Sequence, residues 1–256
     1  MSLIDFVKSN TTYETRLKIR FKLRSLKAKL FMFNLDKLAS IHKTDKNRIH
    51  FYTQHYQKHF KPFQLKKINL LEIGVGGYEN PISGGQSLRM WKSFFPFANI
   101  FSLDIYDKSF LQERRIKIFK GSQIDENFLE NVCGHIGTID LIIDDGSHIN
   151  EHVIKTFEFL FPKLKKNGIY VIEDTQTSYW EEYGGTSKDF KSKGTIYHYF
   201  KSLIDSLNHE EFILENYQKT YYDKHIVAMH FYHNMIFIYK GKNNEPSNKV
   251  RGNQFK

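Results

Sequence analysis

The chain has 256 residues, of which 40% are hydrophobic and 16% aromatic, and its formal net charge is +10. This composition is typical of one large α/β domain with a substantial core, and it excludes a disordered chain. No apolar run reaches about eighteen residues, so we expect no membrane span. The single cysteine, Cys133, excludes an intramolecular disulfide and suits a reducing compartment. Because residues 1–10 show no cationic leader before an apolar run, we expect a cytoplasmic protein.

The positive charge is mostly lysine spread along the chain, with a local concentration at residues 16–29. Such a charge could serve a nucleic acid, a membrane surface or an anionic small substrate. Lysine far outnumbers arginine and asparagine is frequent, which is also typical of an AT-rich genome. We therefore interpret the charge as a source of solubility rather than as a nucleic-acid surface.

The N-terminal part of the chain has helical periodicity. Over residues 13–40, hydrophobic residues recur among cations at near-helical spacing, which predicts a helix that packs on the domain or on a second subunit. Residues 48–60 predict a second helix, in which Tyr52 and Tyr56 lie one turn apart.

From residue 68 onwards, apolar strand-like runs alternate with amphipathic helices, a pattern that indicates a parallel sheet with helices on both faces. Two further runs at residues 225–241, around His233 and Asn234, predict a C-terminal antiparallel hairpin. We therefore predict an α/β fold with a doubly wound, mainly parallel seven-stranded sheet. Its other strands are predicted at residues 68–75, 98–105, 114–121, 139–145 and 167–174, and its helices at 87–95 and 150–164.

Glycines follow the first of these strands directly. The strand carries Glu72 near its end, and Gly74, Gly76 and Gly77 come next. Glycine lets a ligand approach the backbone closely, and ligands of open α/β sheets bind beyond the carboxyl ends of the strands. A dinucleotide site would need glycine or alanine where this chain has Glu79, and a helix at once. The glycines alone leave a ligand loop and a plain tight turn equally open.

An acid, Asp104, closes the second strand. An acid at this place typically binds both ribose hydroxyls of a nucleoside, and a turn or helix-cap aspartate is the alternative. Together with Glu72 it favours a cationic nucleoside ligand. S-adenosylmethionine carries a sulfonium and an amino group, whereas the diphosphate of NAD would be repelled. The charges therefore favour methyl transfer over hydride transfer.

The third strand is followed by a polar segment that contains Ser122, Gln123 and Asp125. These side chains could hydrogen-bond an adenine edge. They could equally be turn residues.

Two pairs of acids end two strands that we expect to be neighbours. Asp144 and Asp145 close one buried strand, and Glu173 and Asp174 close the next. Four carboxylates in one crevice repel one another unless a cation neutralises them. Oxygen ligands without cysteine select a hard cation, Mg²⁺ first, with Mn²⁺ or Ca²⁺ as alternatives. Some of the acids could instead cap helices or pair with lysines, but two pairs together favour a metal.

His148 lies three residues beyond Asp145, at the start of the next predicted helix. Histidine exchanges protons near neutral pH, so beside a metal it is the natural general base. Direct ligation of the metal by its ring is a second interpretation.

As a set, the motifs resemble those of the metal-dependent sugar O-methyltransferases that tailor antibiotic and polysaccharide sugars, within the class I S-adenosylmethionine-dependent family. The resemblance covers about residues 44–241. It implies a Rossmann-like methyltransferase domain over residues 61–241, after an N-terminal helical extension or lid at 1–60 and before a polar tail at 242–256. The motifs are TDK (44–46), LLEIGVGGY, GGQSLRMWKSFFP, LDIYDK, GSQID, LIIDDGSH, YVIEDTQTSYWEEYGG and HFYHNMIFIYKG. The chain has Asn47-Arg48 where the family often has Trp-Gly.

The resemblance implies S-adenosylmethionine and Mg²⁺ as cofactors and His148 as the catalytic base. It implies an acceptor loop at residues 177–185, in which Tyr179 and Trp180 are candidates for stacking on a sugar. Asp144 would face the methionine end of the cofactor. The implied metal ligands are Asp145, Glu173 and Asp174. The implied cofactor-binding residues are Glu72, Gly74, Gly76, Asp104, Ser122, Gln123 and Asp144.

We therefore expect an O-methyltransferase that acts on the hydroxyl group of a sugar. We expect the sugar to be nucleotide-linked or part of a surface polysaccharide, because a basic surface suits the diphosphate of such a substrate. Three alternatives stay open: a catechol-type O-methyltransferase, an RNA methyltransferase and a non-catalytic nucleotide-sugar binder. We also consider a homo-oligomer formed through the N-terminal helices.

Overall fold

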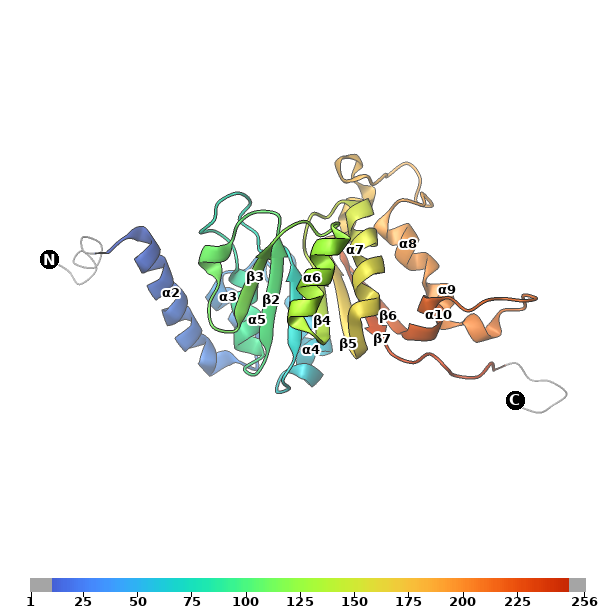
Figure 1. The fold of residues 1–256 in the computed structure, drawn as a ribbon, viewed down its shortest axis with the longest axis horizontal. Helices are drawn as coiled ribbons and strands as arrows, with labels where there is room; N and C mark the ends of the chain where they lie inside the picture. Colours follow the sequence, from blue (N-terminus) through green and yellow to red (C-terminus); the bar gives the residue numbers. More distant parts are fainter. Residues whose placement is uncertain (1–10, 249–256) are drawn as a thin grey trace. The chain divides into compact units, whose positions relative to one another are not determined.

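A computed structural model describes residues 11–248 of the chain. Its seven strands belong to one mixed sheet in the order β3-β2-β1-β4-β5-β7-β6 (Figure 1). The pairs β2–β3, β1–β4 and β4–β5 are parallel, and the pairs β5–β7 and β7–β6 are antiparallel. The predicted α/β fold with a C-terminal antiparallel hairpin is thus confirmed. The chain divides into two compact units, unit 1 with Met1–Ile68 and Val75–Gly121, and unit 2 with Asn69–Gly74 and Ser122–Lys256.

Unit 1 begins with two helices where the sequence predicted one. Helix α2 spans Tyr13–Ala28 and continues as a 3-10 turn at Lys29–Phe31, and α3 spans Leu35–His42. The prediction of a single helix over residues 13–40 was wrong because Asn34 takes an extended conformation and its side chain accepts a hydrogen bond from the Lys37 backbone N–H. An N-cap of this kind starts a new helix.

The second predicted helix is present as α4, Thr53–Phe60, and it belongs to the core of unit 1. Tyr56 lies 4.8 Å from Trp91, and Phe60 lies 5.7 Å from the same ring, between ring centroids. Trp91 belongs to α5, Gln86–Phe94, so aromatic packing joins α4 to α5. The strands of this unit are β2, Asn99–Asp104, and β3, Ile116–Lys120.

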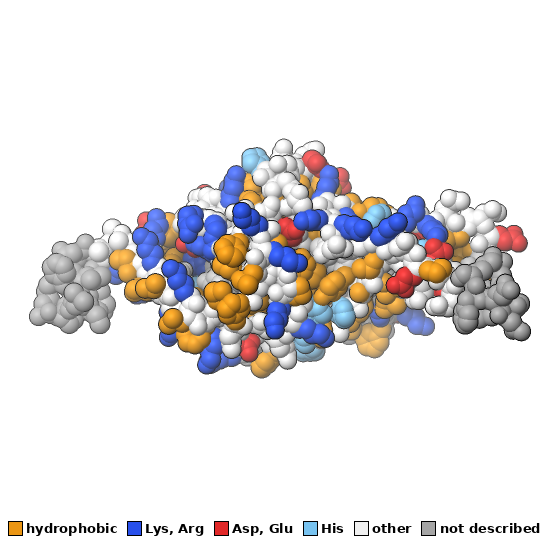
Figure 2. Space-filling model, turned by 90° about the horizontal axis from the view of Figure 1, so that it is seen from below, with side chains coloured by type: hydrophobic (Ala, Val, Ile, Leu, Met, Phe, Trp, Pro, Cys, Tyr) orange, Lys and Arg blue, Asp and Glu red, His pale blue; other side chains and the backbone are white. Residues whose placement is uncertain are grey.

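Helix α2 leaves the apolar side chains of Leu23 and Leu26 in solvent, and the 3-10 turn that follows it leaves Leu30 exposed. Lysine and arginine side chains are dispersed over the face of the molecule that Figure 2 shows, among neutral and hydrophobic ones. This dispersal agrees with our interpretation of the charge as a source of solubility. The expectation that the N-terminal helices join two copies of the chain stays a prediction.

Unit 2 contains the acid-bearing strands. Helices α6 and α7 lie side by side over the sheet (Figure 1). The strands are β1, Asn69–Ile73, β4, Ile139–Asp144, β5, Leu164–Glu173, β6, Ile226–Tyr232, and β7, Met235–Lys240. The helices are α6, Glu126–Ile136, α7, Asn150–Lys163, α8, Ile196–Ser202, α9, Ile204–Leu207, and α10, Tyr221–His225.

Helix α7 ends at Lys163, one residue after Pro162 and one residue before the predicted end at residue 164. An early end is typical of a helix with proline near its C-terminus. The buried Lys240 Nζ donates hydrogen bonds to the last carbonyl groups of this helix, those of Phe161 and Pro162, and to that of Leu164. The strand β5 begins at Leu164, directly after the helix and three residues before the predicted start at residue 167.

No helix within residues 11–248 is long and apolar enough to cross a bilayer. Of the polar tail predicted at residues 242–256, residues 249–256 lie outside the described part of the chain. The same holds for residues 1–10 of the predicted extension at 1–60.

Candidate active site

The ends of β1 and β4 pack so closely that only glycine fits between them. Ile73 pairs with Asp144, and the Asp145 backbone N–H donates to the Ile73 carbonyl oxygen at 3.1 Å. Gly74 follows with a φ of +91°, and a Cβ there would overlap the Asp145 carbonyl oxygen. Because Gly74 has no Cβ, the end of the acid-bearing strand β4 can approach the end of β1. The contact of Gly74 with a cofactor stays a prediction.

In unit 1, Asp104 holds the start of the glycine loop. Its Oδ2 accepts a hydrogen bond from the Val75 backbone N–H at 2.9 Å, and its Oδ1 accepts one from the Tyr106 N–H, also at 2.9 Å. Gly76 has a φ of +75°, and a Cβ there would meet no described atom within 4 Å. The carboxylate is thus fixed in place, and the space beside the Gly76 Cα is open.

A buried lysine that the sequence analysis did not single out closes the same loop. Lys108 Nζ donates to the carbonyl oxygens of Asn80, at 2.9 Å, and Ser83, at 3.2 Å. Burial lowers the pKa of Lys108. No pattern in the sequence indicates this role, because both acceptors are backbone atoms more than twenty residues away in the chain.

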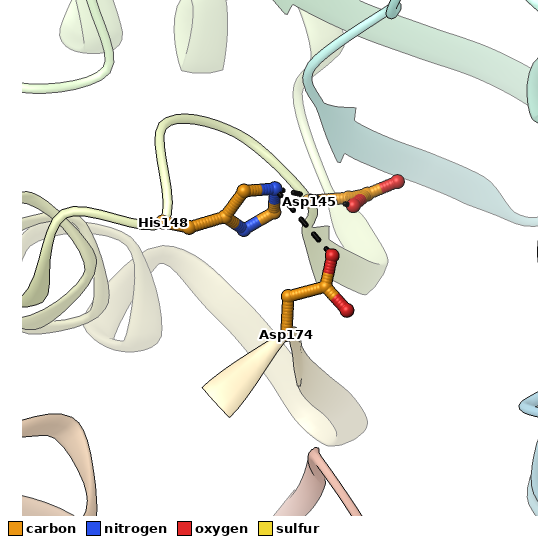
Figure 3. Close-up of side chains that lie close together, drawn as sticks. All are labelled: Asp145, His148 and Asp174. Atoms are coloured by element: carbon orange, nitrogen blue, oxygen red, sulfur yellow. Dashed lines mark ion pairs between the residues drawn. The ribbon is translucent and has the colours of Figure 1, made fainter. Parts of the chain in front are cut away.

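The central cluster of unit 2 consists of Asp145, His148 and Asp174 (Figure 3). His148 Nε2 lies 3.8 Å from Asp145 Oδ1 and 3.7 Å from Asp174 Oδ2. The two aspartates follow the ends of β4 and β5, and the imidazole ring points between their carboxylates. All three side chains are partly exposed, so the cluster is accessible to solutes.

The spacing of these atoms fits one divalent cation. One ligand atom from each residue lies within 4.8 Å of the other two. In octahedral coordination at about 2.1 Å, ligand atoms lie roughly 3 to 4 Å apart. The two carboxylates are typical ligands of Mg²⁺ or Mn²⁺, whereas an imidazole ligand is more typical of Zn²⁺. The interpretation of His148 as a base and its interpretation as a ligand both agree with this geometry.

Two members of the cluster sit on left-handed backbone. His148 has a φ of +56°, and Asp174 has a φ of +52°. Residues other than glycine rarely adopt such angles, and the cost is of order 1–3 kcal/mol for each. Strain of this kind accumulates at functional sites, where it directs side chains toward a common point.

The other two acids of the predicted set lie deeper. Glu173 is buried at the last position of β5, beside Met235 of β7, and it is not among the three clustered residues. Asp144 is buried at the end of β4, where burial raises its pKa to about 7. The ligation of a metal by Glu173 and the contact of Asp144 with a cofactor stay predictions.

The candidate cofactor residues are divided between the units. Gly76 and Asp104 belong to unit 1. Glu72 is fully buried in β1 of unit 2. Ser122 and Gln123 are also in unit 2, where the Ser122 Oγ accepts from the Ile124 N–H at 3.4 Å, as in a turn. Their adenine contacts stay predictions.

Exposed aromatic rings line the predicted acceptor loop. Tyr179 is 40% exposed and packs against Tyr197 and Phe190, with centroid distances of 5.5 and 5.8 Å. Trp180 is 44% exposed and lies 5.9 Å from Tyr183. Less than half of the surface of each residue is exposed, and this part could contact another molecule. Such surfaces are typical of sugar-binding sites but also of partly packed loops.

Curated relatives are O-methyltransferases. The chain is 45% identical over 214 residues to the mycinamicin VI 2''-O-methyltransferase of Micromonospora griseorubida, and 45% identical over 214 residues to the demethylmacrocin O-methyltransferase of Streptomyces fradiae. Each alignment covers 83% of this chain and 54% of the relative. A further relative is the 8-demethyl-8-alpha-L-rhamnosyl tetracenomycin-C 2'-O-methyltransferase of Streptomyces olivaceus, at 42% identity over 80% of this chain and 54% of the relative. Most of the chain is therefore similar to O-methyltransferases.

A solved structure of a similar protein confirms the fold class. MycE methyltransferase from the mycinamycin biosynthetic pathway, in complex with Mg and SAH, matches with a TM-score of 0.81 and 45% identity. The match covers 83% of this chain and 55% of MycE. This chain therefore spans about half the length of the relatives that it matches. No family model matches the chain.

Proposed function

We propose that the chain is a magnesium-dependent O-methyltransferase that moves the methyl group of S-adenosylmethionine to a sugar hydroxyl. The observation that carries the proposal is the cluster of Asp145, His148 and Asp174 at the ends of two neighbouring strands. It occurs in a chain that is 45% identical to MycE, which was solved with Mg and SAH. The donor set fits the metal, so the chemistry of the relatives is a reasonable expectation for this chain.

The nucleoside part of the cofactor would lie beside Asp104 and Gly76. The Asp104 carboxylate is held by two backbone N–H groups, and each oxygen keeps a lone pair for a ribose hydroxyl. The positive φ of Gly76 and the open space at its Cβ position leave room for the ligand. The negative charge of Glu72 suits the sulfonium or amino group of the methionine end.

Asp145 and Asp174 would hold the metal, with Glu173 as a third acid nearby in the chain. When bound, Mg²⁺ supplies Lewis acidity and fixes the acceptor oxygens, which favours the deprotonated hydroxyl. His148 Nε2 lies 3.8 Å from the Asp145 carboxylate and 3.7 Å from the Asp174 carboxylate. From this position it would take up the proton of the acceptor hydroxyl. The acceptor oxygen then forms a bond to the methyl carbon as the carbon–sulfur bond breaks, and S-adenosylhomocysteine leaves.

The acceptor would be a hydroxyl with a second oxygen beside it, because a metal with three protein ligands keeps positions for two substrate oxygens. The relatives are named for methylation at the 2'' position of mycinamicin VI and at the 2' and 3' positions of a rhamnosyl tetracenomycin. Glycosides of this kind are therefore the first acceptors to test. A nucleotide-linked or surface-polysaccharide sugar, expected from the sequence, is the second group.

The deciding experiment is a mass-shift screen with isotopically labelled S-adenosylmethionine. Rhamnosides, nucleotide sugars, a catechol and RNA would each be incubated with the chain, with and without Mg²⁺. The proposal expects a labelled methyl group on a sugar only when Mg²⁺ is present, and less labelled product from Asp145→Asn at the same Mg²⁺ concentration. Transfer to catechol or RNA alone, or transfer that is insensitive to chelation, would contradict it. Binding of a nucleotide sugar without transfer to any acceptor would support the non-catalytic alternative.

A further inference from the structure

A glutamine amide lies behind the loop that carries the metal-site residues. Gln123 is buried, with 7% of its surface exposed. Its Oε1 accepts a hydrogen bond from the Ser147 backbone N–H at 2.8 Å. Its Nε2 donates to the Thr156 hydroxyl at 3.0 Å and lies 3.4 Å from Asp144 Oδ1. Both hydrogens of the amide nitrogen thus have partners inside unit 2.

The hydrogen bond between Gln123 and Ser147 acts on the loop of the metal site. Ser147 stands between Asp145 and His148, so the amide fixes the backbone between two of the three clustered side chains. The Ser147 hydroxyl also lies 3.0 Å from His152 Nδ1, in the first turns of α7. The loop is therefore held both by Gln123 and by the helix that follows it.

The glycine beside Ser147 fits the same arrangement. A Cβ at Gly146 would overlap the Gln123 Oε1 and would approach Ile73 Cγ2 to 2.8 Å. The side chain of Gln123 therefore fills the space that any residue larger than glycine would need. Loop and amide are complementary in shape as well as in hydrogen bonding.

Only an amide meets these demands. It accepts from the Ser147 N–H with one end and donates toward Thr156 and Asp144 with the other. A glutamate would accept with both ends and would add a negative charge beside Asp144. A methionine would fill the same volume but would leave the partly buried Ser147 N–H and the buried Asp144 Oδ1 without this partner.

We propose that Gln123 is a positioning residue that sets the separation of Asp145 and His148 and thereby the affinity of the site for a divalent cation. This inference rests on the proposed function. This role differs from the adenine contact that the sequence suggested for Gln123. Both N–H groups of its amide already donate hydrogen bonds within unit 2. Removal of the amide should loosen the loop, so that the ligand atoms are held less closely at the spacing that a cation needs.

The test is the binding of Mg²⁺ alone, by titration calorimetry, to the folded full-length chain without acceptor. Gln123→Met should weaken Mg²⁺ binding about tenfold, and Gln123→Glu should weaken it also, whereas the dissociation constant of S-adenosylhomocysteine without metal should change less than about twofold. Gln64→Met is the matched control, because Gln64 is buried in unit 1 and its Nε2 donates to the Met32 carbonyl oxygen. This control should bind Mg²⁺ as the wild type does.

Thr156→Val provides a second variant if the Gln123 variants do not fold. It keeps the branched shape but removes the hydroxyl that accepts from Gln123 Nε2, and it should weaken Mg²⁺ binding about threefold. Unchanged Mg²⁺ affinity in Gln123→Met, or in Thr156→Val where that variant alone is folded, would overturn the positioning role. A tenfold loss of S-adenosylhomocysteine affinity with unchanged Mg²⁺ affinity would assign Gln123 to adenine instead. A wild-type chain that binds no divalent cation would contradict the proposed function itself.

Discussion

Asn150 Nδ2 donates a hydrogen bond of 3.0 Å to the carbonyl oxygen of Thr177, which lies 27 residues further along the chain. The same nitrogen donates to the Tyr183 carbonyl oxygen at 2.8 Å, and Asn150 Oδ1 accepts from the Ile196 N–H at 2.7 Å. Asn150 is buried at the start of α7, two residues after His148. One amide therefore ties the candidate acceptor loop and the start of α8 to the helix that follows the candidate base.

Replacement of the Asn150 amide should weaken the binding of the sugar acceptor more than the binding of Mg²⁺. Asn150→Ala removes three buried hydrogen bonds, which should cost about 2–4 kcal/mol of unfolding free energy and loosen residues 177–183. We expect the KM for the sugar acceptor to rise about tenfold, with Mg²⁺ affinity unchanged. Hydrogen exchange and steady-state kinetics measure these effects. Asn131→Ala, an exposed change on α6, is the control, and equal protection of residues 177–183 in both variants would refute the expectation.

The candidate base is tested by His148→Ala. Loss of a general base typically lowers the rate by 10²–10⁴-fold, so we expect kcat to fall by about a hundredfold or more. The affinity for S-adenosylmethionine should stay within about twofold, because the imidazole lies with Asp145 and Asp174. His135→Ala, which alters an exposed ring on α6, should retain full activity. If His148→Ala turns over at the wild-type rate, the base lies elsewhere.

Removal of the metal should abolish methyl transfer reversibly. EDTA is expected to lower the rate at least about a hundredfold, since both activation of the hydroxyl and placement of the acceptor depend on the cation. Added Mg²⁺ should restore it in the wild type, whereas Asp145→Asn and Asp174→Asn should need higher Mg²⁺ concentrations. Asp205→Asn, at an exposed position in α9, should respond to Mg²⁺ as the wild type does. Full activity in EDTA would exclude the metal-dependent scheme.

The stability of the chain should fall in mild acid because of His42. Its Nε2 lies 2.9 Å from Ser93 Oγ, and burial together with the charge of Arg89 lowers the pKa of His42 to about 4. The unfolded chain, with an ordinary pKa of about 6.5, takes up the proton first as the pH falls. The stabilisation is therefore complete above about pH 6.5 and is lost toward pH 4, by up to about 3 kcal/mol.

Urea unfolding at several pH values measures this effect against His42→Gln, which cannot titrate. The difference in unfolding free energy between wild type and variant should shrink steadily from pH 7 to pH 4. Two parallel pH profiles would show that His42 titrates with the same pKa in the folded and unfolded states.

The strands and their acidic ends were predictable because they depend on local pattern. Apolar runs that end in Asp145 and Asp174 located the cluster, and the turn at His233 and Asn234 located the hairpin. Local pattern also explains the wrong single helix, because the periodicity of apolar residues passes through Asn34 without a break. A cap residue inside such a pattern was the signal that was missed.

The residues that support the site could not be found in this way. Lys108 and Asn150 act on carbonyl groups more than twenty residues distant, and backbone acceptors leave no trace in the sequence. Gln123 was noticed, but its partners, the Ser147 N–H and the Thr156 hydroxyl, depend on how α7 packs over the sheet. Long-range partners of this kind require the fold itself.

The left-handed backbone at His148 and Asp174 restricts what protein engineering can change. Valine, isoleucine and threonine are strongly disfavoured at such angles, whereas asparagine, aspartate, histidine and glycine are tolerated. Among the described residues, Asp145 is not one of those with a positive φ. A mutant library aimed at a different metal preference therefore has its widest chemical choice at position 145, and only a few residue types at positions 148 and 174.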